Sequence, residues 1–366
     1  MSFEFRLARE EDDQELRELL RDIEMSGDIA LSFEHEPNYF VASNCANLNS
    51  QTMLVVDRER NSIVGVASRA IRYAYVDGIK TKIGYLSNLR GKKEVRNALL
   101  LAKGYKFLKK LHGDAEVNFY ISTIFSDNNV AQNILTSQRA GLPIYQERGK
   151  ITTGFISLMG RHKFHVPQVV RFSESTQSIK GVVEFINRYN AKFQYAPCYS
   201  VEDFVGEDKL VGFSTNELYL YIKEGKIAGV MGAWNQTSFK QVKVNGYSKT
   251  YQYLRPLYNL YTKLKGVPPL PPVGSYIQNI YGSFIAIEDN DIEVFHALLN
   301  SIKERWANRG FSYIAIGFHE KHPLHGELLK CLSQKLESVL YEVYWDDEEV
   351  VLPKEGLVPY VEIATL

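Results

Sequence analysis

The side chains best suited to acid–base chemistry gather in one short segment, Glu34-His35-Glu36. Histidine changes its charge near neutral pH, and a neighbouring carboxylate tunes its pKa. Such a group can accept the proton of an attacking amine, directly or through a water molecule. The three residues are therefore candidates for a general base. The alternative is an ordinary solvated loop that leads into a helix before Pro37.

A second chemically marked segment is the basic run RGKKEVRNALL, residues 90–100, which we expect to open a helix from Glu94 to about Leu111. A helix N-terminus exposes unpaired N–H groups and the positive end of the helix dipole, so it stabilises a bound phosphate. The cations that would strengthen this field are Arg90, Lys92, Lys93 and Arg96. The backbone of residues 90–95 is thus predicted to hold a diphosphate; the alternative is a solvated basic helix start.

A metal centre is a weaker interpretation of three histidines, His319, His322 and His325. Imidazole groups that recur at a spacing of three would suit zinc. Pro323 interrupts any helix that would hold them in a fixed geometry. We therefore predict no metal site.

The overall composition argues against several classes of protein. The chain has 366 residues, with 43 Lys and Arg against 43 Asp and Glu, and this zero net charge argues against a dedicated nucleic-acid binder. Its three cysteines form no CxxC pair, which argues against a disulfide framework and favours a reducing compartment. No apolar run approaches the ~20 residues that span a bilayer, and residues 1–10 do not resemble a signal peptide. We expect a cytoplasmic protein.

An internal repeat organises the elements that must position these side chains. FRLARE, from Phe5, predicts a short strand followed by a helix, and VRFSES, from Val170, predicts the same. The hairpin strand Ile63–Val66 has a counterpart in Ile227–Val230. Both pairs are separated by about 165 residues, and such a fixed period indicates duplicated units.

Each unit interleaves strands with helices in the order β-α-(α)-β-β-β-α-β-α-β. This order predicts an α/β fold of the α+β type, with a central mixed β-sheet flanked by helices in each of two tandem domains. We place the domains at residues 1–160 and 165–366, with a linker at residues 160–165. The second domain carries an insert at about 236–273, rich in tyrosine and lysine. It could stack on nucleic acid, pack against the domain seam, or form a lid over an acceptor site.

The second unit is predicted not to bind an anionic ligand at the matching place. Its equivalent of the basic run ends in Glu288, Asp289 and Asp291, whose carboxylates would repel a phosphate. Asp289 or Asp291 is better explained as a helix cap.

The order of elements and two motifs resemble the GNAT acyltransferase superfamily. The family's RGKGxGxALL signature is matched by Arg90, Gly91, Lys92 and Ala98-Leu99-Leu100, and its NxxA…KxGF pattern is matched from Asn128 to Tyr145. In residues 3–158 the resemblance includes both the motifs and the order of elements, and in residues 170–344 it includes only the order of elements. It implies an acyl-CoA-binding GNAT-like domain at 1–160 and a degenerate GNAT-like domain at 165–366.

The resemblance also implies a binding site for coenzyme A. Members of the family direct the acyl carbonyl to a backbone N–H of the fourth strand, here Leu86 to Leu89. The cofactor-binding residues predicted in this way are Leu86, Ser87, Leu89, Arg90, Gly91, Lys92, Lys93, Glu94, Val95 and Asn128.

Several positions depart from the family pattern. Lys93 and Val95 stand where the family has glycines, and Leu135 stands where many members have an acidic tyrosine. Tyr145 or Tyr120 could take over that tyrosine's role. The predicted catalytic residues are Glu34, His35, Glu36 and Tyr145.

These inferences predict an N-acyltransferase that moves an acetyl group from acetyl-CoA to an amine of a small molecule or peptide by direct attack. One alternative is a non-catalytic GNAT-fold binding or regulatory protein, which the missing glycines and tyrosine favour. Another is a transferase that uses aminoacyl-tRNA or a long-chain acyl-CoA. We expect no nucleic-acid or membrane partner, and the sequence leaves the oligomeric state open.

Overall fold

The computed structural model describes residues 2–25, 27–139, 141–160, 166–206, 209–265, 267–307, 309–346 and 350–366. The predicted linker therefore lies almost entirely outside the described residues. Within them, no helix is both long enough and apolar enough to cross a lipid bilayer.

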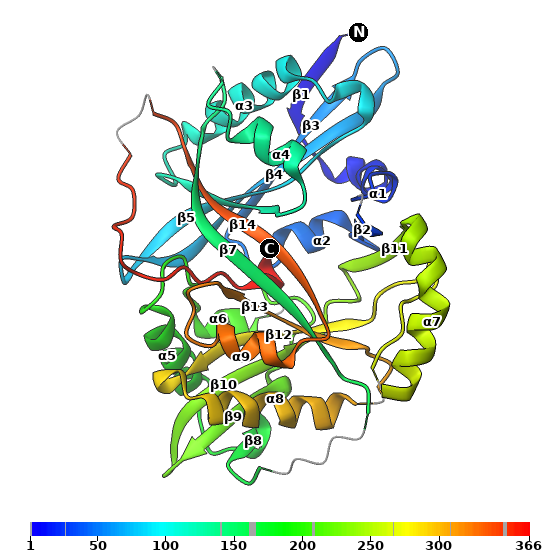
Figure 1. Ribbon diagram of the computed structural model, residues 1–366. Coiled ribbons are helices and arrows are strands. Elements are labelled where there is room, and N and C mark those ends of the chain that lie inside the picture. Colours follow the sequence, from blue (N-terminus) through cyan, green and yellow to red (C-terminus); the bar gives the residue numbers. More distant parts are fainter. Residues whose placement is uncertain are drawn as a thin grey trace.

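One continuous mixed sheet runs through the described chain (Figure 1), in the strand order β1-β3-β4-β5-β6-β14-β7-β13-β12-β10-β9-β8. The strands from the first half of the sequence are β1 (Phe3–Leu7), β3 (Asn49–Asp57), β4 (Ser62–Val76), β5 (Ile79–Gly91), β6 (Tyr120–Phe125) and β7 (Ile144–Ser157). Those from the second half are β8 (Val169–Arg171), β9 (Leu218–Lys223), β10 (Lys226–Trp234), β12 (Asn279–Ile287), β13 (Tyr313–His319) and β14 (Gln334–Tyr344).

The two halves exchange their last strands at the centre of this sheet. β14 pairs antiparallel with β6 on one side and with β7 on the other. β7 in turn pairs with β13. Each half is thus completed by a strand from the other, and the predicted boundary between residues 160 and 165 stays a prediction.

Helices cover both faces of the sheet, as expected for a mixed α/β fold (Figure 1). They are α1 (Asp13–Asp22), α2 (Tyr39–Asn44), α3 (Ala98–His112), α4 (Asn129–Leu135), α5 (Ile179–Asn190), α6 (Val201–Val205), α7 (Lys249–Lys265), α8 (Ile292–Trp306) and α9 (His325–Cys331). In α1, the buried residues are Leu16, Leu19 and Leu20, at the helical spacing that the sequence indicates. The Asp291 side chain accepts hydrogen bonds from the N–H groups of Glu293 and Val294, which confirms its predicted role as a helix cap.

The repeat is visible in the pairing. β3 and β4 form the expected hairpin, and so do β9 and β10. β4 and β5 are joined directly through Asp77 and Gly78, whereas residues 235–278 separate β10 from β12. This extra segment contains β11 (Gln241–Tyr247) and α7, where the insert is predicted. β11 leaves the main sheet and pairs with β2 (Ile29–Glu34) from the first half.

Candidate active site at the splayed strands

The first half contains an opening between two parallel strands. β5 and β6 pair only from Gly84 to Leu86 and from Tyr120 to Ser122, after which β6 continues alongside β14. Gly84 is required at this apex, because a Cβ there would lie 2.0 Å from a ring carbon of the buried Tyr120. The edge of β5 beyond Leu86 is therefore free of a strand partner on that side. Phe33 lies between the diverging ends, since its ring stacks on Phe125 of β6 at 6.0 Å and contacts Arg90 of β5.

A β-bulge lies at the mouth of this opening. Val66 faces Arg90 and Ser68 faces Ser87, so Asn88 and Leu89 together oppose Ala67. Asn88 adopts φ 53°, in the left-handed region that asparagine tolerates better than most residues. The bulge turns a backbone N–H out of the regular ladder, within the stretch from Leu86 to Leu89 where a donor to a carbonyl oxygen is predicted.

The second half repeats this arrangement. β12 and β13 pair in parallel only from Asn279 to Tyr281 and from Tyr313 to Ala315. Val230 then faces Ala286 and Gly232 faces Ser283, so Phe284 and Ile285 oppose one residue of β10. Phe284 has φ 57°, close to the value at Asn88. The two bulges are therefore equivalent.

In this second opening, a carboxylate of the chain itself binds the bulge. The Phe284 N–H donates to Oε2 of the buried Glu362 at 2.8 Å. The segment behind Glu362 fills the opening, and a Cβ at Gly317 of β13 would lie only 2.1 Å from Ile363. Arg72 anchors the same segment by donating to the Thr365 hydroxyl and carbonyl oxygens, both at 3.0 Å. The bulge amide is thus a group that binds a partly or fully charged oxygen.

The first bulge has no such occupant. In the described part of the chain, no side chain accepts a hydrogen bond from the Asn88 amide. The Asn88 side chain donates to Ser68 Oγ at 3.4 Å, and Ser68 Oγ lies 3.0 Å from the Tyr39 hydroxyl. Thr52 also donates to that hydroxyl, at 3.3 Å. These side-chain hydrogen bonds hold Asn88 in place and do not use its backbone N–H.

A cation without a carboxylate partner follows the bulge. Arg90 donates to the Phe33 carbonyl at 3.3 Å, and its guanidinium lies 6.0 Å from the Phe33 ring centroid. Burial lowers the pKa of Arg90 to about 10, so the side chain is still charged at neutral pH. No carboxylate of the described residues lies within ion-pair distance of Arg90, Lys92 or Lys93. These cations are free to meet an anionic ligand.

The helix after this loop begins later than the sequence indicates. Lys93 to Val95 form a 3₁₀ turn, and α3 starts at Ala98 instead of Glu94. Asn97 is the N-cap, since its side chain accepts from the Leu100 N–H at 3.0 Å. Part of the helix N-terminus is therefore satisfied by the chain. A diphosphate would be held by the loop cations and the donors that remain.

The glycine replacements in this loop have a packing explanation. Val95 is buried with Val64 and Leu100 in a small apolar cluster. A Cβ at Gly91 would lie 2.9 Å from the Val95 side chain, so Gly91 and Val95 fit each other. Lys93 is exposed, and nothing is described of the Glu94 side chain.

The remaining predicted cofactor contacts lie at the edges of the opening. The Leu86 carbonyl accepts from Ser122 Oγ at 2.9 Å at the apex. Ser87 is half-buried, and Leu89 is exposed. Asn128 caps α4 by accepting from the Ala131 N–H at 3.1 Å, which commits its side-chain oxygen. None of these placements tests coenzyme A binding directly.

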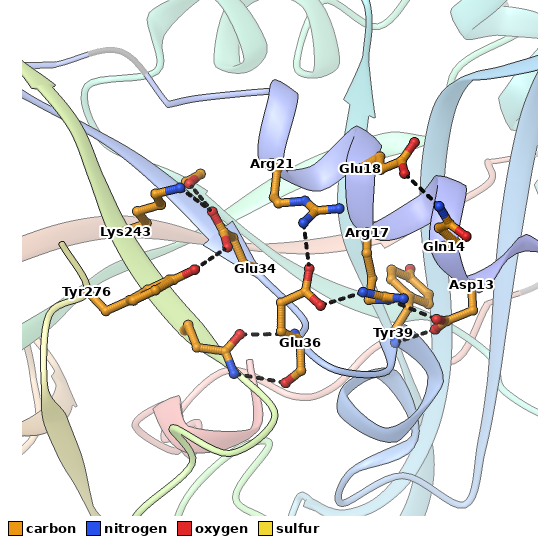
Figure 2. A network of polar contacts seen from close by, with 12 residues as sticks. Asp13, Gln14, Arg17, Glu18, Arg21, Glu34, Glu36, Tyr39, Lys243 and Tyr276 are labelled. Atoms are coloured by element: carbon orange, nitrogen blue, oxygen red, sulfur yellow. Dashed lines mark hydrogen bonds and ion pairs between the residues drawn. The ribbon is translucent and has the colours of Figure 1, made fainter. Parts of the chain in front are cut away.

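Glu34 and Glu36 are both neutralised by cations, in separate networks (Figure 2). Buried Glu34 accepts from the Tyr276 hydroxyl at 3.1 Å and lies 4.0 Å from Lys243 Nζ. Glu36 is paired with Arg17 and, at 3.4 Å, with Arg21. These contacts hold the β2–β11 ribbon in place.

His35 differs from its two neighbours. It is buried, and its Nδ1 has no hydrogen-bond partner among the described residues. Burial, together with the positive charges of Lys240 and Arg90, holds the pKa of His35 well below its ordinary value. The ring is therefore neutral at pH 7. It lies 5.3 Å from the Tyr39 ring, which links it to the polar chain behind the Asn88 bulge.

Tyr145 is buried in the core beneath α3. Its hydroxyl lies 2.7 Å from that of Tyr105, and burial raises the pKa of Tyr145 to about 12. The hydroxyl is thus a weaker acid than an ordinary phenol. Tyr120, the alternative, accepts a hydrogen bond from Arg69 Nε at 2.9 Å within the same core.

The three C-terminal histidines have separate partners. His319 Nε2 bonds to the Arg148 carbonyl at 2.8 Å, and His325 Nε2 lies 3.0 Å from the Thr152 hydroxyl. His322 stacks on Phe318 with ring centroids 4.2 Å apart, and burial lowers the pKa of His322 to about 3. A search of the described ranges finds no group of three metal-ligating side chains.

Sequence reasoning missed the bulges, the Asn97 cap and the β2–β11 ribbon. The repeat contained a signal for the bulges. Gly65-Val66 and Gly229-Val230 occupy the same positions in the two units, and each pair faces the two residues that follow a bulge. The Asn97 side chain before Ala98-Leu99-Leu100 is also a recognisable cap.

Comparison with known proteins supports the fold. No protein-family model matches the chain, and no curated protein matches it. Two solved structures of Saccharomyces cerevisiae N-myristoyltransferase with bound myristoyl-CoA each align with a TM-score of 0.58 at 13% identity. One alignment covers 93% of this chain and 79% of that chain, and the other covers 98% and 89%. A third structure of the yeast enzyme, with myristoyl-CoA and inhibitors, aligns with a TM-score of 0.57 at 12% identity and covers 93% of this chain and 80% of that chain.

At this level of identity the likeness establishes the fold alone. The predicted fold class, a mixed sheet flanked by helices, is confirmed, and the division into two GNAT-like domains stays a prediction.

Proposed function

We propose that the chain is an acyl-CoA-dependent N-acyltransferase whose donor binds in the opening between β5 and β6. The observation that carries this proposal is the pair of equivalent bulges. In the second half, the bulge amide of Phe284 holds a carboxylate oxygen of Glu362. The equivalent amide of Asn88 donates to no side chain of the described residues. A thioester oxygen in that opening would meet the same kind of donor.

The chemistry follows from this placement. When an amine attacks the thioester carbon, the carbonyl oxygen gains negative charge, and a fixed N–H donor stabilises it. The C–N bond forms, the C–S bond then breaks, and the thiolate of coenzyme A leaves with the electron pair. Arg90 and the lysines of the loop would pair with the phosphates of the donor. The amine proton must pass to a base.

We assign the base to His35, acting through water. Its Nδ1 has no hydrogen-bond partner among the described residues, and the neutral ring can accept a proton there, as a weaker base than an ordinary histidine because of burial and the charges of Lys240 and Arg90. The aromatic and hydroxyl contacts through Tyr39 and Ser68 connect it with the bulge. Glu34 and Glu36 support the ribbon that carries His35 and are proposed as positioning residues.

For the donor, we propose a long-chain acyl-CoA in place of acetyl-CoA. The support is the extent of the fold likeness, since one alignment with a structure that contains myristoyl-CoA covers 98% of this chain. We further propose that the acceptor is the amine of a peptide. The β2–β11 ribbon would border its site, which gives the insert the lid role considered from its sequence.

A thermal-shift series tests the donor. Myristoyl-CoA, acetyl-CoA and free coenzyme A would be compared at equal concentration, because a ligand that binds the native state stabilises it by about 2.7 kcal/mol at 100 times its Kd. The expected order of stabilisation is myristoyl-CoA above acetyl-CoA. If no acyl-CoA raises the melting temperature at millimolar concentration, the proposal is rejected.

A non-catalytic function is the second candidate, and specific contacts favour it. Glu34 and Glu36 are paired with cations, and Tyr145 is sealed in the core. This candidate predicts that myristoyl-CoA binds but that no thiol is released with any amine acceptor. A thiol-release assay with a mixture of peptides bearing free N-terminal amines separates the two.

A further inference from the structure

The helix α7 is attached to the molecule by one face only. Asn259 accepts from the Leu270 N–H at 2.8 Å and donates to the Leu270 carbonyl at 3.2 Å. Arg255 donates to the same carbonyl at 3.3 Å, and the Tyr258 hydroxyl accepts from Gln334 at 3.1 Å. These contacts fix the helix against the proline-rich return of the insert. Figure 1 shows α7 at the periphery of the molecule, beside β11.

The opposite face of α7 is apolar and exposed. Tyr253 is 84% exposed and Leu257 is 68% exposed, which is unusual for two such large side chains one turn apart. At 3.6 residues per turn, the exposed apolar residues fall within an arc of about 120°. They are Tyr253, Leu254, Leu257, Leu260 and Tyr261. An apolar stripe of this length on a described surface indicates a partner.

The charges around this stripe have one sign. The helix contains Lys249, Arg255, Lys263 and Lys265 and no acidic residue. Residues 225–287 include no Asp or Glu but seven Lys and Arg. Of these, Lys243 is paired with Glu34 and Arg255 lies on the attached face, whereas Lys249 at the start of the helix is exposed. Asp28 lies at the beginning of the helix, where it accepts from the Ser248 hydroxyl at 3.1 Å. The surface is therefore complementary to an anionic partner.

We infer that α7 docks the protein onto the surface of an anionic lipid bilayer. A helix with an exposed apolar face of leucine and tyrosine, with lysine and no acidic residue in the same helix, lies in the interface between headgroups and acyl chains. A second copy of the chain is a poorer occupant, since a twofold interface would bring two basic helices together. The expectation of no membrane partner rested on the lack of a spanning segment, and a helix that lies on the surface does not span.

Sedimentation with lipid vesicles tests this inference on the full chain. Phosphatidylcholine vesicles would be compared with vesicles that contain about 30% phosphatidylserine, at low and high salt. We expect the chain to sediment with the anionic vesicles at low salt and to be released as salt screens the charges. A chain that stays in solution with anionic vesicles at millimolar lipid overturns the inference.

A pair of substitutions makes the test specific. Leu257→Glu combined with Leu260→Glu places two carboxylates in the stripe and should weaken vesicle binding by about tenfold or more. Ile79→Glu is the matched control, because Ile79 is as exposed as Leu257 but lies at the β4–β5 turn. It should bind like the unmodified chain. Equal loss in the control, or full binding by the double variant, overturns the inference.

Two further readouts identify other outcomes. Circular dichroism should show unchanged folding of the double variant, since both side chains are solvent-exposed. Light scattering after gel filtration reports the oligomeric state. A dimer that the double variant converts to a monomer would assign the stripe to a second copy and overturn the membrane inference. The test does not depend on acyl-CoA binding, so it can fail or succeed separately from the proposed function.

Discussion

The two halves contain the same splayed pair of parallel strands, but only in the second half does a carboxylate of the chain bind the bulge amide. At corresponding positions beyond the bulge, the first half has Arg90 facing Val66, whereas the second has the buried Ala286 facing Val230. The amide of Phe284 binds Glu362, and the amide of Asn88 meets no side chain of the described residues. The Phe284 bulge shows that such an amide binds a carboxylate oxygen. The Asn88 bulge is followed by the cation Arg90, which favours an anionic group of another molecule.

The largest expected effect comes from distorting the Asn88 bulge. Asn88→Val places a β-branched residue at a positive φ, which moves the amide, and removal of one such donor costs about 10²–10³-fold in kcat. Asn88→Gly keeps the backbone conformation and should retain most of the rate. Steady-state acyl transfer measures both variants, and equal rates for the Val and Gly variants would contradict a role for the Asn88 amide.

The apex of the splayed pair in the first half should be intolerant of any side chain. Gly84→Ala would drive a Cβ into the ring of Tyr120, which Arg69 holds by a hydrogen bond, so we expect a loss of roughly 3 kcal/mol in unfolding free energy. Gly326→Ala is the control, since a Cβ there meets nothing within 4 Å. Urea denaturation compares the two variants. A Gly84→Ala chain as stable as the control would show that the apex is not tightly packed.

The second half should respond to pH. Burial raises the pKa of Glu362 to about 7, above the ordinary value of 4.5, so the folded state holds this proton more tightly than the unfolded state. Its contribution to stability is complete below about pH 4.5 and is lost as the pH rises towards about 7, by up to about 3 kcal/mol.

Glu362→Gln keeps an acceptor for the Phe284 amide and cannot ionise. The variant should lack the decline in stability between about pH 4.5 and 7 and should be more stable than the unmodified chain above it. Denaturant titrations at several pH values measure this. An unchanged pH dependence in the variant would show that Glu362 is already ionised in the folded chain.

The smallest effect is expected from the cation that distinguishes the first half. Arg90→Gln should raise the Kd for acyl-CoA about tenfold, because one charged contact with the phosphates is lost. The variant should lose only about 1 kcal/mol of stability, since Arg90 makes one 3.3 Å hydrogen bond to the Phe33 carbonyl and no ion pair with a carboxylate of the described residues. Calorimetry measures the affinity, and Arg171→Gln, in β8 at the opposite edge of the sheet from β1, is a control. Unaltered affinity would place the phosphates elsewhere.

Local patterns in the sequence predicted a large part of this fold. The leucines of α1, the paired hairpins and the cap at Asp291 depend on residues close together in the chain, and each was predictable. The start of α3 was misplaced because Asn97, a strong N-cap, outweighs the basic residues before it. The charged run looked like the first helical turn but forms a 3₁₀ turn.

The candidate site was harder to predict because it depends on contacts between distant residues. Glu34 accepts a hydrogen bond from Tyr276 and is paired with Lys243, both more than 200 positions away, and no periodicity in the sequence indicates such contacts. Tyr145 looked available in sequence, but its hydroxyl bonds to Tyr105 in the core. Whether coenzyme A binds at residues 86–95 and at Asn128 stays a prediction for the experiments above.

The exchange of β7 and β14 has a consequence for synthesis on the ribosome. β6 is made by residue 125, but the strand that covers its free edge ends at Tyr344. An open edge of this kind readily pairs with other chains. The nascent first half must therefore wait, incomplete, until nearly all of the polypeptide has emerged, and a fragment that stops near residue 160 should aggregate.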